Sequence, residues 1–252
     1  MSEMETAMKD ETTVDVLAVG AHPDDVEIGV GGFLHKLTQR GHRVAILDLS
    51  QGEMSTRGAP EERAEEARQA AEILGVSARE CAELPDGAIT NTTEEQRKLV
   101  PFLRKFRPRV LLANMAPDRH PDHTAAHYLV RDANFFAGLA RIDTGQAPYR
   151  APVLYFYHPY YESEQPHFII DVSDHFEAKL ASLRAHASQF HNPDYEGEET
   201  LISSKSFWDG IVARAAHWGA RAGFAYGEAL HMDGLLAVDL PPGLTPEGTD
   251  QA

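Results

Sequence analysis

Short apolar segments alternate with longer segments of helical character along the first 140 residues. The strand-like segments are Val14–Ala21, Arg43–Ser50, Arg79–Leu84 and Val110–Asn114, and the helix-like segments that follow them are Gly31–Arg40, Glu61–Leu74, Thr93–Phe106 and Thr124–Leu139. Strands joined through helices run in the same direction, because each helix carries the chain back across the sheet. The pattern therefore predicts an α/β fold, a Rossmann-like three-layer sandwich with helices on both faces of a mostly parallel sheet.

The second half of the chain is less regular. Its predicted strands are Val153–His158 and Phe168–Val172, and its predicted helices are Asp174–Phe190 and Ser206–Ala222. We find no internal repeat, and no linker rich in proline, glycine or serine divides the chain. We therefore expect a single domain over residues 13–240, between a disordered leader at 1–12 and a flexible tail at 241–252.

Charge and cysteine content narrow the classes of partner. The formal net charge is −16 at pH 7, which repels nucleic-acid phosphates and anionic membranes. No apolar segment approaches the ~20 residues that a membrane-spanning helix needs. The only cysteine, Cys81, excludes an intramolecular disulfide and fits a reducing compartment. The composition predicts a cytoplasmic protein with a small-molecule partner and neither a nucleic-acid nor a membrane partner.

Histidine and aspartate residues follow two of the predicted strands. The sequence GAHPDDVE, residues 20–27, ends the first strand, and DRHPDH, residues 118–123, follows the strand at Val110–Asn114. Either motif alone could be a turn whose aspartate caps a helix. However, parallel strands end at a common edge of the sheet, where ligands bind in this class of fold. The two motifs are therefore expected to meet and to form one active site.

The residue types in these motifs favour a catalytic metal. Imidazole and carboxylate ligands suit Zn²⁺, with Fe²⁺ as the alternative, and the chain has no thiolate set for a structural zinc site. Residues beyond three metal ligands can supply the base and the acid that acyl hydrolysis requires. Two other classes use the same ligands: a non-heme iron enzyme that consumes O₂, and a metal-dependent binding module. A binding module needs neither base nor acid, so the additional histidine and aspartate residues of the two motifs argue against it.

The motifs resemble those of the LmbE-like (PIG-L-type) zinc N-deacetylase family, and most of all its bacillithiol-biosynthesis branch. The segments that carry this resemblance are GAHPDDVEIGVGG, APEERAEEA, DRHPDH, FIIDVSDHFEAKLASLRAHASQF and IVARAAHWGARAGFAYGEAL. The resemblance implies that His22, Asp25 and His123 hold the metal. It implies that Asp24 is the general base.

The resemblance also implies roles for the remaining residues of the second motif and for the substrate. His120 is expected to protonate the leaving amine or to stabilise the oxyanion, and Asp122 to orient a histidine. The expected reaction removes the N-acetyl group from a glucosamine conjugate, most specifically N-acetylglucosaminyl malate. Another small molecule containing N-acetylglucosamine is the alternative substrate.

Four arginines are candidates for binding an anionic substrate. Arg63 matches a family arginine that faces the site, and Arg150 matches one that some members share across a subunit contact, which implies a homo-oligomer. Arg57 and Arg119 lie in loops after two different strands, where the alternative is ion pairing at the surface. Phe207 stands where some relatives carry a tyrosine.

Overall fold

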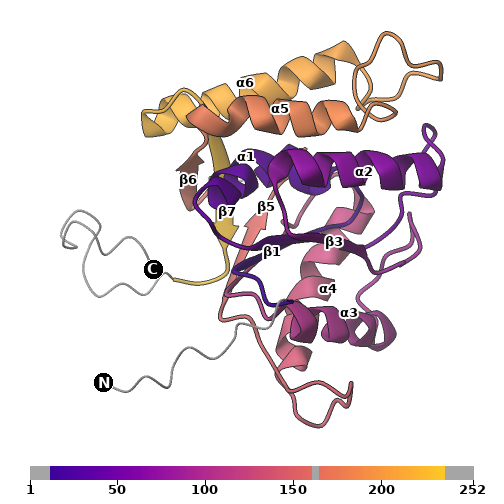
Figure 1. Ribbon diagram of the computed structural model, residues 1–252, viewed down its shortest axis with the longest axis vertical. Helices are drawn as coiled ribbons and strands as arrows, with labels where there is room; N and C mark the ends of the chain where they lie inside the picture. Colours follow the sequence, from indigo (N-terminus) through magenta and orange to yellow (C-terminus); the bar gives the residue numbers. More distant parts are fainter. Residues whose placement is uncertain (1–11, 161–164, 236–252) are drawn as a thin grey trace.

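The computed structural model describes residues 12–160 and 165–235 (Figure 1). The predicted leader and tail lie outside these residues, apart from residue 12. Seven strands form one sheet in the order β3-β2-β1-β4-β5-β7-β6. They are β1 (Val16–Gly20), β2 (Val44–Asp48), β3 (Ala78–Cys81), β4 (Val110–Asn114), β5 (Val153–Tyr157), β6 (Phe168–Asp171) and β7 (Gly227–Met232).

The sheet is mostly parallel, as predicted, and β7 is its exception. β1 pairs in parallel with β2 and β4, and β4 pairs in parallel with β5, whereas β7 runs antiparallel to both β5 and β6. The sequence did not predict β7, because Glu228 and His231 interrupt its apolar residues. Both side chains are buried. Glu228 is neutralised there by Lys179 at 2.5 Å and accepts a hydrogen bond from the backbone N–H of Gly32.

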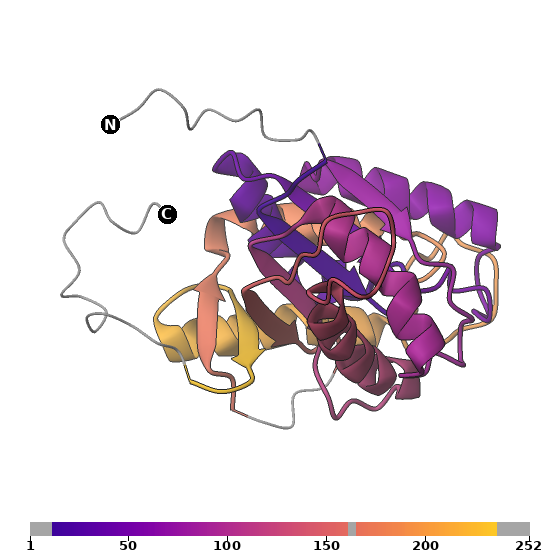
Figure 2. The same ribbon diagram turned by 90° about the horizontal axis from the view of Figure 1, so that it is seen from below.

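Helices cover both faces of the sheet. They are α1 (Asp25–Gln39), α2 (Pro60–Leu74), α3 (Thr93–Phe106), α4 (Pro121–Ala137), α5 (Phe176–Ala185) and α6 (Lys205–Ala222). α3 and α4 lie side by side on one face (Figure 2), and α1 and α2 cover the other. The predicted three-layer arrangement is confirmed, and α5 and α6 add a further layer over α1 and α2 (Figure 1). No helix of the described residues is long and apolar enough to cross a membrane.

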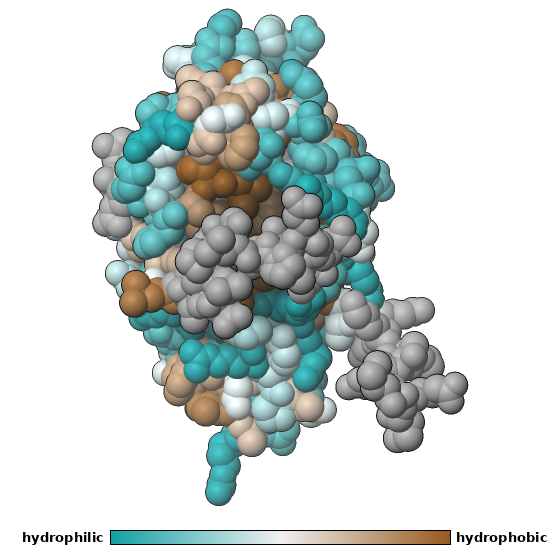
Figure 3. All heavy atoms as spheres, turned by 90° about the vertical axis from the view of Figure 1, so that its left-hand side faces the viewer, coloured by the Kyte–Doolittle hydropathy of each residue, from teal (hydrophilic) through white to brown (hydrophobic). Residues whose placement is uncertain are grey.

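The strand β1 shows how the sheet divides two apolar cores. Leu17 and Val19 pack into the core beneath α3 and α4, whereas Val16 and Ala18 pack into the core beneath α1. This alternation follows from the pleat of a strand, which turns successive side chains to opposite faces. Figure 3 looks from the β6 side of the molecule and shows apolar side chains in a hollow between more hydrophilic surfaces.

Both histidine motifs run into the first turns of helices, which begin earlier than the sequence predicted. α1 begins at Asp25 and not at Gly31, and α4 begins at Pro121 and not at Thr124. Pro121 favours a helix start, because its missing N–H has no partner in the first turn of a helix anyway. Asp25 and His123 consequently lie in the first turns of these helices, whereas His22 lies in the bend just before α1.

A buried ion network fixes the start of α1 against the sheet. Arg79 of β3 contacts Glu27 at 2.5 Å and Asp48 of β2 at 2.7 Å. His186, which follows α5, lies 3.2 Å from the same oxygen of Glu27. Burial alone would raise the pKa of Glu27, but the neighbouring charge of Arg79 and the contact with His186 lower it to about 2. The charged network therefore connects β2, β3, α1 and the segment after α5.

Candidate active site

The two histidine motifs meet where the order of the strands reverses. The chain leaves β1 toward β2 on one side and leaves β4 toward β5 on the other side. The connections that follow β1 and β4 therefore lead away from each other. Crevices at such a point are the usual ligand sites of open α/β sheets. The rings of His22 and His120 lie here with their centroids 4.7 Å apart, and those of His22 and His123 are 5.3 Å apart.

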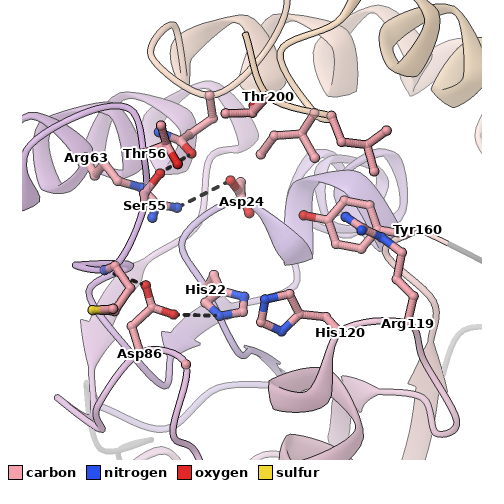
Figure 4. A pocket seen from close by; sticks show the side chains of 15 residues that line it. His22, Asp24, Ser55, Thr56, Arg63, Asp86, Arg119, His120, Tyr160 and Thr200 are labelled. Carbon is pink, nitrogen blue, oxygen red and sulfur yellow. Dashed lines mark hydrogen bonds and ion pairs between the residues drawn. The ribbon is translucent and has the colours of Figure 1, made fainter. Parts of the chain in front are cut away.

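A cavity of about 290 Å³ opens above these rings. His22, Asp24 and His120 line it, together with Arg63 and Arg119. Figure 4 shows Asp24 and Arg63 facing each other on one side of the cavity, with His22 and His120 side by side below them. The structure thus brings residues from the ends of β1 and β4 and from α2 to one cavity.

His123 is held in an orientation that suits a metal ligand. Its Nδ1 lies 3.0 Å from Oδ1 of Asp118, and its Nε2 lies 3.1 Å from Oδ1 of Asp25. Both this Nε2 and this Oδ1 are buried, and neither makes a hydrogen bond to any described residue. If Nδ1 carries the proton that Asp118 accepts and Nε2 carries none, two lone pairs face each other across 3.1 Å, and a metal cation held by both atoms would relieve this repulsion. Without a metal, burial would lower the pKa of His123, but Asp25 and Asp118 raise it to about 9, so a proton on Nε2 takes that place. The donor set fits a metal ion.

His22 contacts carboxylates through both ring nitrogens. Its Nε2 lies 3.1 Å from Asp86 and 3.2 Å from Asp122, and its Nδ1 lies 3.5 Å from Asp25. Burial would lower the pKa of His22, but hydrogen bonds to these three carboxylates raise it well above its usual range. When the histidines are neutral, the carboxylates around His22 leave the cluster with a net negative charge. A divalent cation would balance this charge.

More than one set of side chains could hold the cation. Ring nitrogens of His22, His120 and His123 come within 4.8 Å of one another, as do ligand atoms of His22, Asp86 and Asp122. The predicted set replaces His120 with Asp25, which contacts both of the other ligands. His22 is common to all three sets.

Asp24 is separate from this cluster and is suited to accept a proton. It is 2% exposed, and its Oδ2 lies 3.4 Å from a guanidinium nitrogen of Arg63. Burial raises the pKa of Asp24 to about 6, against the lowering effect of Arg63. Its backbone φ of 151° lies in a region that side-chain-bearing residues rarely adopt. Strained backbone is frequent at active sites.

His120 caps α4, which fixes which of its nitrogens carries a proton. Its Nδ1 accepts a hydrogen bond from the backbone N–H of Asp122 at 3.2 Å. In the neutral ring, Nε2 therefore carries the proton. Burial and the charges of His22 and His123 lower the pKa of His120, which favours this neutral form. Neutral His120 is a hydrogen-bond donor.

The four candidate arginines occupy different environments. Arg63 and Arg119 line the cavity, and Arg63 also donates hydrogen bonds to the carbonyl oxygens of Gly52 and Pro23. Arg57 is buried and is not among the described residues that line the cavity. Its Nε donates a hydrogen bond to the carbonyl oxygen of Ser188 at 2.6 Å.

Arg150 lies on another part of the surface. Its guanidinium stacks over Phe135 of α4 at 5.1 Å, outside the described lining of the cavity. Phe207 does not line this cavity either, whereas Tyr160 does, and its hydroxyl points inward in Figure 4.

Sequence reasoning missed three residues of the site. Asp86 follows β3, so the rule that placed the histidines at strand ends would also have found it. Asp118 belongs to the second motif and contacts His123, but the sequence predicted no role for it. Tyr160 gave no signal in the sequence. It stacks on His123 with the rings 5.2 Å apart.

Comparison with known proteins gives relatives over most of the chain. Residues 17–134 match the family model of PIG-L, described as GlcNAc-PI de-N-acetylase. A diacetylchitobiose deacetylase from Thermococcus kodakarensis is 31% identical over 231 residues, which cover 85% of this chain and 81% of the relative. A solved structure of a conserved protein from Thermus thermophilus has a TM-score of 0.82 and 34% identity, covering 91% of this chain and 99% of that one.

Two more distant relatives differ in their reactions. A probable N-acetyl-alpha-D-glucosaminyl L-malate deacetylase from Bacillus anthracis is 29% identical over 188 residues, 69% of this chain and 81% of the relative. A 4-oxalmesaconate hydratase from Pseudomonas putida is 26% identical over 195 residues, 71% of this chain and 75% of the relative.

The fold and the site together define an enzyme of the deacetylase class, with a histidine and aspartate cluster that can hold a metal ion. The chain belongs to the PIG-L family, the family that its two histidine motifs resemble. The resemblance stated from the sequence is confirmed at this level.

Proposed function

We propose that this protein is a zinc-dependent N-deacetylase that removes the acetyl group from a small N-acetylglucosaminyl conjugate. The observation that carries the proposal is that a cluster able to hold a metal ion and a separate buried carboxylate lie side by side at one cavity. The buried cluster around His22 and His123 has the donors that Zn²⁺ prefers, and Asp24 stands apart from it as an ionisable base. Two relatives named as deacetylases of acetylated amino sugars support this reaction type.

The residues of the cavity suggest a division of labour in amide hydrolysis. His22, Asp25 and His123 would hold the zinc ion, which when bound polarises the acetamide carbonyl and makes water more acidic. Asp24 accepts the proton of the attacking water and passes it to the leaving amine. Arg63 keeps the Asp24 carboxylate in place. Neutral His120 donates a hydrogen bond from Nε2 to the developing oxyanion.

N-acetylglucosaminyl malate is the conjugate that we propose first, as the sequence predicted. The relative from Bacillus anthracis supports it. Arg119 supports it physically, because it lines the cavity and its guanidinium lies over the ring of Tyr160 at 4.7 Å. A guanidinium in the cavity can bind a carboxylate of the malate. A cytoplasmic location and a homo-oligomer accompany this proposal. The first rests on the single cysteine and the second on the family match of Arg150.

Acetate release tests the proposed reaction. The purified protein is stripped of metal, reloaded with Zn²⁺ or Fe²⁺, and incubated with N-acetylglucosaminyl malate, N,N′-diacetylchitobiose or N-acetylglucosamine. We expect one acetate per free amine formed, loss of turnover after chelation, and recovery with Zn²⁺. A parallel assay with 4-oxalmesaconate follows hydration. Hydration without acetate release from any amide would show that the proposed function is wrong.

A further inference from the structure

A buried histidine lies next to the carboxylate that contacts His123. His158 directly follows β5, and its side chain has no exposed surface. It is not among the described residues that line the catalytic cavity. Its Nδ1 lies 3.6 Å from Oδ2 of Asp118, whose other carboxylate oxygen lies 3.0 Å from Nδ1 of His123. The three side chains therefore form a row that begins at a predicted metal ligand and ends at His158.

The contact between Asp118 and His158 joins polar atoms that are otherwise unsatisfied. Oδ2 of Asp118 and both ring nitrogens of His158 are buried, and none of them makes a hydrogen bond to a described residue. Oδ1 of Asp118 is already occupied by the ring of His123 and by the backbone N–H of His120. Buried polar atoms without a partner are costly, and a shift of roughly 0.6 Å would bring Nδ1 and Oδ2 to an ordinary hydrogen-bond distance. The two groups therefore suit each other as donor and acceptor.

The charge of Asp118 decides which group is the donor. Burial would raise the pKa of Asp118, but its contacts with His123 and His158 lower this pKa well below its usual range. The carboxylate is therefore ionised at neutral pH, and an ionised carboxylate accepts hydrogen bonds but cannot donate them. The proton of the pair consequently comes from Nδ1 of His158.

The ring of His158 packs against His231 of β7. The two rings meet edge to face at right angles, with their centroids 5.1 Å apart. His231 is 1% exposed, and burial together with the neighbouring His158 and His167 lowers its pKa to about 4. His231 is therefore neutral at physiological pH and adds no positive charge beside His158. Its ring restricts the orientation of His158 by contact alone.

We propose that His158 is a positioning residue for the metal site. Its Nδ1–H donates a hydrogen bond to Oδ2 of Asp118 and so fixes the carboxylate that orients the ring of His123. The inference rests on the zinc site of the proposed function, in which His123 is a ligand. Carboxylates that are themselves hydrogen-bonded orient histidine ligands and make them better donors to the metal. His158 extends this support to the end of β5, which contributes no residue to the predicted ligand set.

Zinc affinity tests the proposal. We would strip the purified protein of metal and measure its affinity for Zn²⁺ by competition with a chromophoric chelator. His158→Leu fills a similar volume without a donor, and we expect the affinity to fall roughly tenfold, the lower end of the range for residues that support metal ligands. His158→Asn places an amide N–H close to the position of Nδ1 and should restore most of the affinity. The control His231→Phe keeps a ring against His158 and should change the affinity much less.

A double variant separates positioning through Asp118 from packing. If His158 acts through Asp118, the variant Asp118→Ala should bind Zn²⁺ as well as the double variant Asp118→Ala with His158→Leu, because the second change removes a partner that is already lost. A packing effect of His158→Leu would instead add to the loss in Asp118→Ala. The same chelator competition measures all four proteins of this cycle.

The outcomes distinguish this inference from the proposed function. Unchanged zinc affinity in His158→Leu, an equal loss in His158→Asn, or additive losses in the double variant would overturn the positioning role, while acetate release by the wild type would still support the deacetylase. Zinc binding with the expected pattern of variants but no acetate release from any amide would overturn the proposed function and leave the role of His158 intact. A wild type that binds no Zn²⁺ would overturn both.

Discussion

Oδ1 of Asp118 lies 3.0 Å from Nδ1 of His123, and both side chains are buried. The same oxygen accepts a hydrogen bond from the backbone N–H of His120 at 2.9 Å. One carboxylate therefore fixes the ring orientation of a predicted metal ligand and the start of the segment that carries the second motif. Such carboxylates orient histidine ligands in many metal sites.

Replacing Asp118 should weaken metal binding without removing a ligand. Asp118→Asn loses the charge that holds the His123 ring, and we expect zinc affinity to fall roughly 10- to 100-fold. Competition with a chromophoric chelator measures this change. Asp132→Asn, at a partly exposed position of α4, the helix that carries His123, is the control. Equal zinc affinity in Asp118→Asn and the wild type would contradict a positioning role.

The ligand set can be resolved by single replacements. We expect one zinc ion per chain, and we expect His22→Ala, Asp25→Ala and His123→Ala each to lower the bound metal and the activity together. Elemental analysis of the purified variants gives the stoichiometry, with His217→Ala as the control because His217 is an exposed histidine on α6. Retention of zinc by Asp25→Ala with loss by His120→Ala would assign the site to the three histidines.

The general base should be visible in the pH dependence. Asp24 must be ionised to accept a proton, and burial raises its pKa to about 6. We therefore expect kcat/KM to fall as the pH drops below about 6, with activity retained above it. Asp24→Asn should keep the metal and lose activity by roughly 10²- to 10⁴-fold. Turnover by Asp24→Asn at the wild-type rate would rule out this role.

The ion network behind the site should dominate the stability of this region. Arg79→Met leaves the buried carboxylates of Glu27 and Asp48 without their cation, which typically costs about 3–5 kcal/mol of unfolding free energy. Urea denaturation followed by circular dichroism measures the change. Arg68→Met removes an arginine from an exposed pair with Glu65, and solvent screens such pairs, so we expect a much smaller effect. Similar losses in both variants would contradict this account.

The arginines should differ in their effect on an anionic substrate. Arg119→Ala removes a cation from the cavity, and we expect it to raise KM for N-acetylglucosaminyl malate more than for N-acetylglucosamine. A hydrogen bond to a charged group contributes roughly 1.5–3 kcal/mol, which corresponds to about tenfold or more. Arg150→Ala, outside the described lining, should leave this substrate preference unchanged. Steady-state kinetics with both substrates measure the difference.

The sequence by itself determined the main sheet and the place of the site. The apolar segments around Val16–Gly20 and Val110–Asn114 have few alternatives to a buried strand, and the helices between them require parallel pairing. Because parallel strands end at one edge, His22 and His123 had to approach each other although they are 101 residues apart in the chain. This inference needed only local pattern and one topological rule.

Tertiary structure alone decided which polar groups became partners. A local pattern records that a residue is polar, but it does not record whether water or another side chain satisfies it. Arg57 and Arg119 both follow strands, yet one is buried against a backbone carbonyl and the other lines the cavity. Tyr160 follows β5, and it reaches the site only because β5 pairs with β4. Such contacts arise from the packing of distant segments, which no local sequence pattern encodes.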